Sequence, residues 1–94
     1  MGHSYSSSLF HVAFSTKDRK KCLDVTLRER LFPYIGGVAK QHGMIALTVG
    51  GVEDHVHVLL HLPADTALAK AVQVIKSVSS KWIHETFPEQ RQFA

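Results

Sequence analysis

The segment DHVHVLLHL, residues 54–62, decides the fold of this 94-residue chain. If these residues form a β-strand, successive side chains point to opposite faces of the sheet. The residues on one face are all aliphatic, and they are Val56, Val58, Leu60 and Leu62. The other face carries Leu59 and three histidines, which are His55, His57 and His61. The alternation therefore predicts a strand with one face on a hydrophobic core and the other free for chemistry.

His55 and His57 are the candidate metal ligands. Cα atoms two residues apart on a strand are roughly 6.5–7 Å apart and point the same way, so two imidazoles at this spacing can converge on one ion. His61 lies about 13 Å from His57 by the same rise and is no obvious third ligand. Asp54 precedes the strand, where a carboxylate can act as an outer ligand or orient a ligating histidine. The alternative is a half-exposed strand face in which the histidines hold nothing.

Composition places the chain among small cytoplasmic domains. Ninety-four residues with 45% hydrophobic content make one domain with a thin core. The formal net charge of +3 favours an anionic partner such as nucleic acid. A single cysteine, Cys22, excludes an intrachain disulfide and fits a reducing cytoplasm. No apolar run approaches the roughly 20 residues of a membrane span, so we expect no membrane association.

The first half of the chain predicts a strand and a helix joined by a basic loop. Residues 1–7 form a polar lead-in, and residues 9–15 alternate as a strand. Residues 16–21 form a loop that is either an ordinary solvated surface or a grip on a phosphate backbone. Its cations are Lys17, Arg19, Lys20 and Lys21.

The helix that follows is capped by Asp24 and stopped by Gly43. Its apolar residues recur at helical spacing, and they are Leu27, Leu31, Ile35 and Val38. Pro33 within this helix predicts a kink, or a short turn before it and a longer helix after it.

The second half predicts a hairpin and a second helix. Residues 44–49 form a strand whose Ile45, Leu47 and Val49 share one face, and a Gly-containing turn leads into the histidine strand. The last helix starts after Pro63 with Asp65 or Thr66 as its cap, and Pro88 ends it. Its predicted buried stripe is Leu68, Val72, Ile75, Ser79, Trp82 and Ile83. Lys76 and Lys81 lie outside this stripe, where they serve either solubility or DNA binding.

The order of elements is strand, helix, strand, strand, helix. We therefore predict an α+β fold, a ferredoxin-like antiparallel sheet with two helices on one face, whose fourth strand is absent from this chain. The fourth strand would pair with residues 9–15, and without it that edge is open to another chain.

Three segments now support a resemblance to a known family. Residues 10–19, 52–60 and 74–81 resemble the N-terminal two-thirds of the single-tyrosine HUH transposases, which include the insertion sequence 200/605 group and the transposases associated with repetitive extragenic palindromes. The HUH motif, histidine, hydrophobic residue, histidine, is matched by residues 55–57. Glu53 is a departure, because the family often has proline there.

The resemblance implies DNA transposition by a single-strand endonuclease in the bacterial cytoplasm. His55 and His57 would hold Mg²⁺ or Mn²⁺ with a third ligand. Single-stranded DNA with hairpin ends would be the substrate, and a homodimer the active form. Lys17, Arg19, Lys20, Lys21, Lys76 and Lys81 would contact the DNA.

The resemblance also implies that the attacking tyrosine and a C-terminal helix lie beyond Ala94. The chain would then be a C-terminally truncated HUH domain over residues 1–94 with no catalytic nucleophile, and inactive alone. Tyr5 and Tyr34 do not match the family's tyrosine. The sequence does not contain the motifs of three other classes of protein, which are the histidine-triad hydrolases, the two-histidine phosphoesterases and the RNA-recognition modules. The remaining alternative is a non-catalytic remnant of a transposase that binds DNA or forms dimers.

Overall fold

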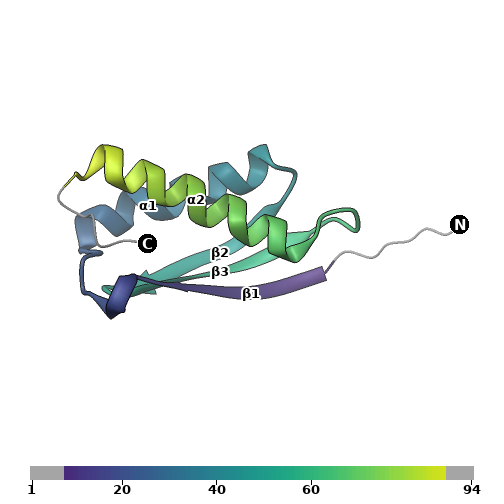
Figure 1. Cartoon of the computed structure of the whole chain (residues 1–94). Coiled ribbons are helices and arrows are strands. Elements are labelled where there is room, and N and C mark those ends of the chain that lie inside the picture. Colours follow the sequence, from purple (N-terminus) through teal and green to yellow (C-terminus); the bar gives the residue numbers. More distant parts are fainter. Residues whose placement is uncertain (1–7, 89–94) are drawn as a thin grey trace, which may run out of the picture.

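A computed structural model describes residues 8–88, which form three strands and two helices (Figure 1). The strands are β1 (Ser8–Ser15), β2 (Ile45–Val52) and β3 (His55–Leu62). The helices are α1 (Val25–Gln41) and α2 (Leu68–Thr86), and a short 3-10 turn, η1 (Lys17–Arg19), follows β1. The lead-in and the tail, residues 1–7 and 89–94, lie outside the described residues.

The sheet has the strand order β1-β3-β2, and both pairings are antiparallel. Both helices lie over one face of the sheet, and its other face carries no helix among the described residues (Figure 1). This is the ferredoxin-like order without its fourth strand, so the predicted α+β fold class is confirmed. The outer edges of β1 and β2 have no partner strand within residues 8–88. No helix in this part of the chain is both long and apolar enough to cross a membrane.

The core lies between β3 and the two helices. Every second residue of β3 is buried, from Val56 to Leu62, as the alternation predicted. Buried leucine and isoleucine side chains of α1 and α2 cover these positions, among them Leu27, Leu31 and Ile75, and each is fully buried. Removing such a side chain from water contributes about 1.5–3 kcal/mol, so this one strand anchors the fold.

Both ends of α1 are closed by hydrogen bonds. The Asp24 carboxylate accepts a 2.9 Å hydrogen bond from the Leu27 amide, which confirms the predicted cap. At the other end Gly43 adopts a φ of 75°, and the Met44 amide donates to the Ala39 carbonyl at 2.8 Å. A left-handed glycine with this backward bond satisfies carbonyls that the helix leaves open.

The predicted break at Pro33 into a short turn and a longer helix is wrong, because α1 runs unbroken from Val25 to Gln41, while the alternative of a kink stays a prediction. Pro33 is exposed, while Leu31 and Ile35 on either side of it are buried. The missing amide hydrogen bond therefore lies on the solvent side, and the packing of the buried face holds the helix together across it.

The predicted common face of Ile45, Leu47 and Val49 is also wrong. The register between β2 and β3 shifts between Ala46 and Thr48, so Leu47 is an extra residue in a β-bulge. The bulge reverses the alternation. Ala46 and Val49 pack against the core, whereas Ile45 and Leu47 are exposed on the helix-free face.

The start of α2 differs from the prediction. The helix begins at Leu68 after Ala67, with no side-chain cap, and Asp65 and Thr66 belong to the preceding turn. Leu68 is 36% exposed and Ala71 is buried in its place, while Val72 and Trp82 pack only partly against the core.

Candidate functional site

The histidine residues of β3 lie on the face of the sheet that carries no helix. The ring centroids of His55 and His57 are 6.2 Å apart, and both side chains are half-buried. Strand alternation alone produces this arrangement, because Val56 between them points into the core. The rings share one face as the sequence predicted, at a distance from which both can reach one ion.

Asp54 orients the ring of His55. Its Oδ1 lies 2.9 Å from Nδ1 of His55, and its Oδ2 lies 3.4 Å from Nε of Arg19. The hydrogen bond with His55, and beyond it the charge of Arg19, lowers the pKa of the Asp54 carboxyl below its usual value. The carboxylate is therefore charged at neutral pH and favours the imidazole form with a proton on Nδ1. That form leaves Nε2 free as a ligand atom.

His57 is positioned by the fit of its ring against β2. Gly50 of β2 is its cross-strand neighbour, and a Cβ built on Gly50 would lie 3.0 Å from Cε1 of His57. The imidazole thus occupies the space above the glycine. A Cβ on Gly51 would instead collide with the backbone of His55 and Val56. The two glycines therefore allow close approach of the strands and give room to the ring.

His11 is a neighbour that the sequence analysis did not assign to the site. Its ring centroid lies 5.4 Å from that of His57, at an interplanar angle of 52°. Antiparallel pairing of β1 with β3 sets His11 opposite Leu59, on the helix-free face. The alternation of β1 puts His11 on the other face of the strand from Phe10 and Val12. This pattern could have indicated from the sequence that His11 lies on the helix-free face. The strand pairing was needed to bring it next to His57.

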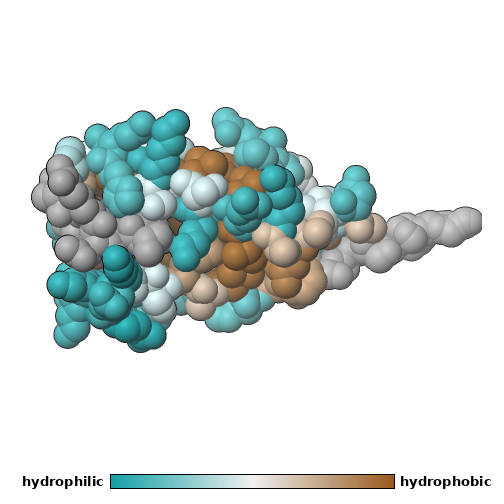
Figure 2. Space-filling view, in the orientation of Figure 1, coloured by the Kyte–Doolittle hydropathy of each residue, from teal (hydrophilic) through white to brown (hydrophobic). Residues whose placement is uncertain are grey.

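The basic loop is joined to the turn that precedes His55. The Thr16 amide donates to the Asp54 carbonyl at 2.9 Å, and the Leu23 amide donates to the Glu53 carbonyl at 3.0 Å. All four predicted cations of this loop are exposed, and they are Lys17, Arg19, Lys20 and Lys21. Figure 2 shows hydrophilic residues gathered at the end of the molecule where η1 lies. The loop thus brings positive charge beside the histidine face.

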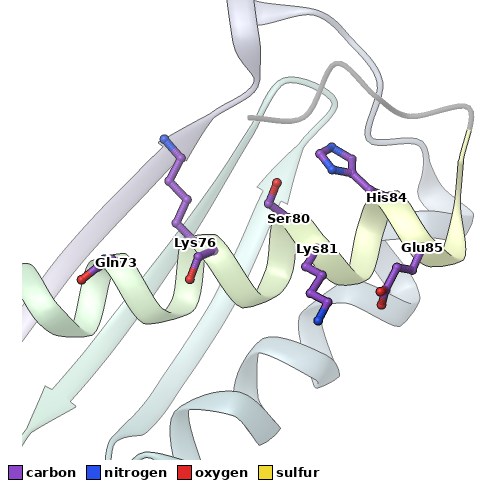
Figure 3. Close-up of a pocket in the computed structure, with 7 residues that line it drawn as sticks. Gln73, Lys76, Ser80, Lys81, His84 and Glu85 are labelled. Carbon is purple, nitrogen blue, oxygen red and sulfur yellow. The ribbon is translucent and has the colours of Figure 1, made fainter.

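Lys76 and Lys81 belong to a different surface. Both are exposed on α2, which covers the opposite face of the sheet from the histidines. With other polar residues of α2 they line an open depression of about 580 Å³. Figure 3 shows Lys76, Ser80 and His84 pointing to one side of the helix and Lys81 to the other. The six predicted DNA contacts therefore form two separate groups.

Tyr34 is the sole tyrosine among the described residues, and it lies in the helix layer. Its ring stacks on Trp82 of α2 with centroids 4.8 Å apart, as expected for a packing role. Tyr5 falls outside the described residues. Residues 8–88 also contain no group of three or more histidine, cysteine or acidic side chains that could hold a metal ion. His61 does not join His55 and His57 as a third ligand, because it lies four residues beyond His57 on β3 and opposite Leu9.

Comparison with known proteins gives a consistent result. Residues 4–94 match the family described as "Transposase IS200 like". The chain is similar to the ISDra2 transposase TnpA of Deinococcus radiodurans, with 25% identity over 92 residues that make up 97% of this chain and 66% of that protein. A crystal structure of a protein assigned as a transposase, from Deinococcus radiodurans R1, superposes with a TM-score of 0.89 at 24% identity. It is covered over 72% of its length, and this chain over 98%.

Proposed function

Because the chain belongs to the IS200-like transposase family, we propose that it serves DNA transposition by metal-dependent cleavage and rejoining of single-stranded DNA. One observation carries the proposal: His55 and His57 share the helix-free face, with Asp54 on Nδ1 of His55. The chain spans 66% of the length of the curated relative that it matches.

The donor set of the site suits a metal ion that also binds phosphate. Two imidazoles would fill two coordination positions and would leave others for a further ligand and for phosphate oxygens. When bound, Mg²⁺ or Mn²⁺ polarises the scissile phosphate and stabilises the charge that develops on it. Imidazole alone would suit zinc better than magnesium, so the choice of Mg²⁺ or Mn²⁺ rests on the resemblance to the family. His55 and His57 are the residues of this chain that would hold the ion.

The basic loop would position the DNA strand. Lys17, Lys20 and Lys21 are exposed beside the turn at Asp54, where ammonium groups can bind successive phosphates. Such contacts release counterions, so affinity for single-stranded DNA should fall as salt is added. A strand that follows this loop runs on toward the histidine face, which brings one of its phosphates to the proposed ion.

Cleavage also requires an attacking group. In the proposed reaction a tyrosine oxygen bonds to phosphorus, the bond from phosphorus to the 3′ oxygen breaks, and that oxygen takes up the proton that the phenol releases. The products are a 5′-phosphotyrosine and a free 3′ hydroxyl, and the reverse reaction rejoins a strand. Tyr34 stacks on Trp82 in the helix layer, so this oxygen comes from outside residues 8–88. Tyr5 lies outside the described residues and does not match the tyrosine of the family, so we expect no cleavage by the 94-residue chain alone.

A homodimer completes the proposal. The outer edge of β1 is unpaired within the described residues, and an unpaired edge favours pairing with a second strand. Large apolar residues, among them Leu9 and Ile45, are also more than half exposed on the helix-free face. Light scattering across a concentration series tests this, and a monomer at the highest concentration would contradict it.

Metal binding and DNA cleavage can be tested together. Titration calorimetry with Mn²⁺ should show one site in the wild type and its loss in His55→Ala and His57→Ala, whereas His42→Ala, at the end of α1, should bind normally. A nicking assay on hairpin-bearing single strands then tests the chemistry in a longer relative with a tyrosine helix. Equal Mn²⁺ affinity in all three variants would refute the proposal.

One observation favours a second function, that of a non-catalytic DNA-binding or dimer-forming protein. Among the described residues, no tyrosine hydroxyl lies beside His55 and His57. Such a protein would bind single-stranded DNA as tightly without Mn²⁺ as with it. The proposed enzyme should instead bind the scissile phosphate more tightly in its presence.

A further inference from the structure

Arg19 was predicted as a DNA contact, but its position indicates a different role. Its Nε lies 3.4 Å from Oδ2 of Asp54, on the side of the carboxylate away from His55. Asp54 thus bridges the two residues, since its Oδ1 lies 2.9 Å from Nδ1 of His55. The Arg19 side chain is 65% exposed, so the pair adds little to the stability of the fold. This geometry instead allows Arg19 to orient the Asp54 carboxylate.

The loop that carries Arg19 is fixed at both ends to the hairpin turn. Thr16 and Leu23 donate their amides to the carbonyls of Asp54 and Glu53. The Thr16 side chain is buried, and its hydroxyl donates to the Lys20 carbonyl at 2.7 Å. The turn and the loop therefore form one unit, and the distance between Arg19 and Asp54 does not depend on a freely moving segment.

The backbone at Arg19 is unusual for this residue type. Asp18 and Arg19 both have a φ of 56°, in the left-handed region that non-glycine residues seldom occupy. Two such residues in succession reverse the chain within η1, and this reversal brings the Arg19 side chain back to Asp54. Residues held in this region tend to cluster at functional sites. An arginine that only bound phosphate from a solvated loop would not need this conformation.

We propose that Arg19 is a positioning residue for the metal site, which holds the Asp54 carboxylate against Nδ1 of His55. A fixed carboxylate keeps the neutral ring in the form with a proton on Nδ1. Nε2 of His55 then faces the helix-free side as a ready ligand atom. The inference rests on the proposed function in one respect, because the ligand role of His55 comes from there. The orientation of the ring by Arg19 can be measured without any metal.

The test uses nitrogen NMR of the full metal-free chain, at a pH about two units above the ordinary histidine pKa of ~6.5, where imidazoles are neutral. The Arg19→Asn variant is suitable because asparagine tolerates positive φ, so the loop keeps its shape while the guanidinium is lost. Lys40→Gln, on the exposed side of α1, removes the same charge far from the site. His55 signals are assigned by their absence in His55→Gln.

In the wild type and in Lys40→Gln we expect the His55 signals of the form protonated on Nδ1. In Arg19→Asn the equilibrium should move toward the form protonated on Nε2, and Mn²⁺ affinity should fall about tenfold. Arg19→Lys, which keeps a cation within reach of Asp54, should restore both properties in part. His55 signals that are the same in Arg19→Asn as in the wild type would overturn the proposal, even if DNA affinity falls.

The two proposals fail in different ways. If no variant binds Mn²⁺ but the His55 signals still change in Arg19→Asn, the metal site is wrong and the positioning role stands. If Mn²⁺ binds normally to the wild type and to Arg19→Asn, with unchanged His55 signals, the metal site stands and Arg19 does not position it. A thermal melt of each variant confirms that a change in the signals does not come from unfolding.

Discussion

The two faces of β3 differ in what a substitution on them should change. Val56, Val58, Leu60 and Leu62 are at most 2% exposed, and each packs under the helices. His55 and His57, on the other face, touch one carboxylate, one glycine and one further histidine. Stability therefore depends on one set of residues and the proposed chemistry on the other. A single strand serves both because its side chains alternate.

Leu60→Ala gives the largest expected effect. Leu60 is fully buried, so its truncation should lower the free energy of unfolding by about 2–5 kcal/mol through lost burial and the cavity left behind. His57→Ala should change it by only about 0.5 kcal/mol, because that face bears no helix. Urea denaturation followed by circular dichroism measures both. Equal losses in the two variants would erase the distinction between the faces.

Gly50→Ala tests the helix-free face without removing a histidine. The added methyl group would lie 3.0 Å from Cε1 of His57 and displace the ring, so Mn²⁺ affinity should fall about tenfold. Gly37→Ala on α1 is the matched control, since a Cβ there meets nothing within 4 Å. Calorimetric titration compares the two. An unchanged affinity in Gly50→Ala would show that the ring is free to move aside.

Ser79→Ala tests a buried hydroxyl on the side of the sheet that the helices cover. The Ser79 hydroxyl is buried, and within the described part of the chain its oxygen has no hydrogen-bond partner. Replacing it by a methyl hydrogen should raise the free energy of unfolding by about 1 kcal/mol. Chemical denaturation of this variant beside Ser77→Ala, an exposed serine on the same helix, tests it. A loss of stability would reveal a partner for the Ser79 hydroxyl.

The lysines on the two sides can be compared by salt dependence. Each phosphate contact with single-stranded DNA contributes about 0.7 to the slope of log affinity against log salt. Lys20→Ala with Lys21→Ala should lower the slope by roughly twice that amount, and so should Lys76→Ala with Lys81→Ala if DNA reaches both sides. Fluorescence anisotropy at several salt concentrations gives the slopes. If only the second pair changes it, DNA binds on the helix side alone.

Cys22 should show the smallest effect, where the basic loop meets the core. Burial raises the pKa of its thiol above the ordinary value, because the thiolate is disfavoured there. The stability that the protonated Cys22 thiol contributes is therefore complete below the pKa of the thiol in the unfolded chain. It is lost as pH rises through the raised pKa of the folded state. Alkylation at mildly basic pH should be slower in the native chain than in urea. Equal rates would mean that the thiol is already open to solvent.

Much of the fold could be predicted because it depends on local rules. The alternation of β3, the Asp24 cap and the glycine at the end of α1 each follow from a few neighbouring residues. The errors arose where distant packing decides. The bulge at Leu47 depends on the partner strand, and the burial of Ala71 in place of Leu68 depends on how α2 meets the other elements.

The candidate site shows the same division. The shared face of His55 and His57 follows from their spacing of two residues. The approach of His11 needs the pairing of β1 with β3, and the contact of Arg19 with Asp54 needs two left-handed residues that no pattern in this sequence indicates. Residues that hold the ligands in place are thus harder to find from sequence than the ligands themselves.

The bulge at Leu47 gives β2 one residue more than its partner strand requires. Ala46 pairs with Leu60 and Thr48 pairs with Leu59, so without Leu47 the two strands would pair in the same register without interruption. Gly50 would still lie opposite His57, and Val49 would still lie opposite Val58. A deletion of this one residue should therefore leave every later residue of β2 on its present face. Natural length variation among relatives should be tolerated at this position of the strand.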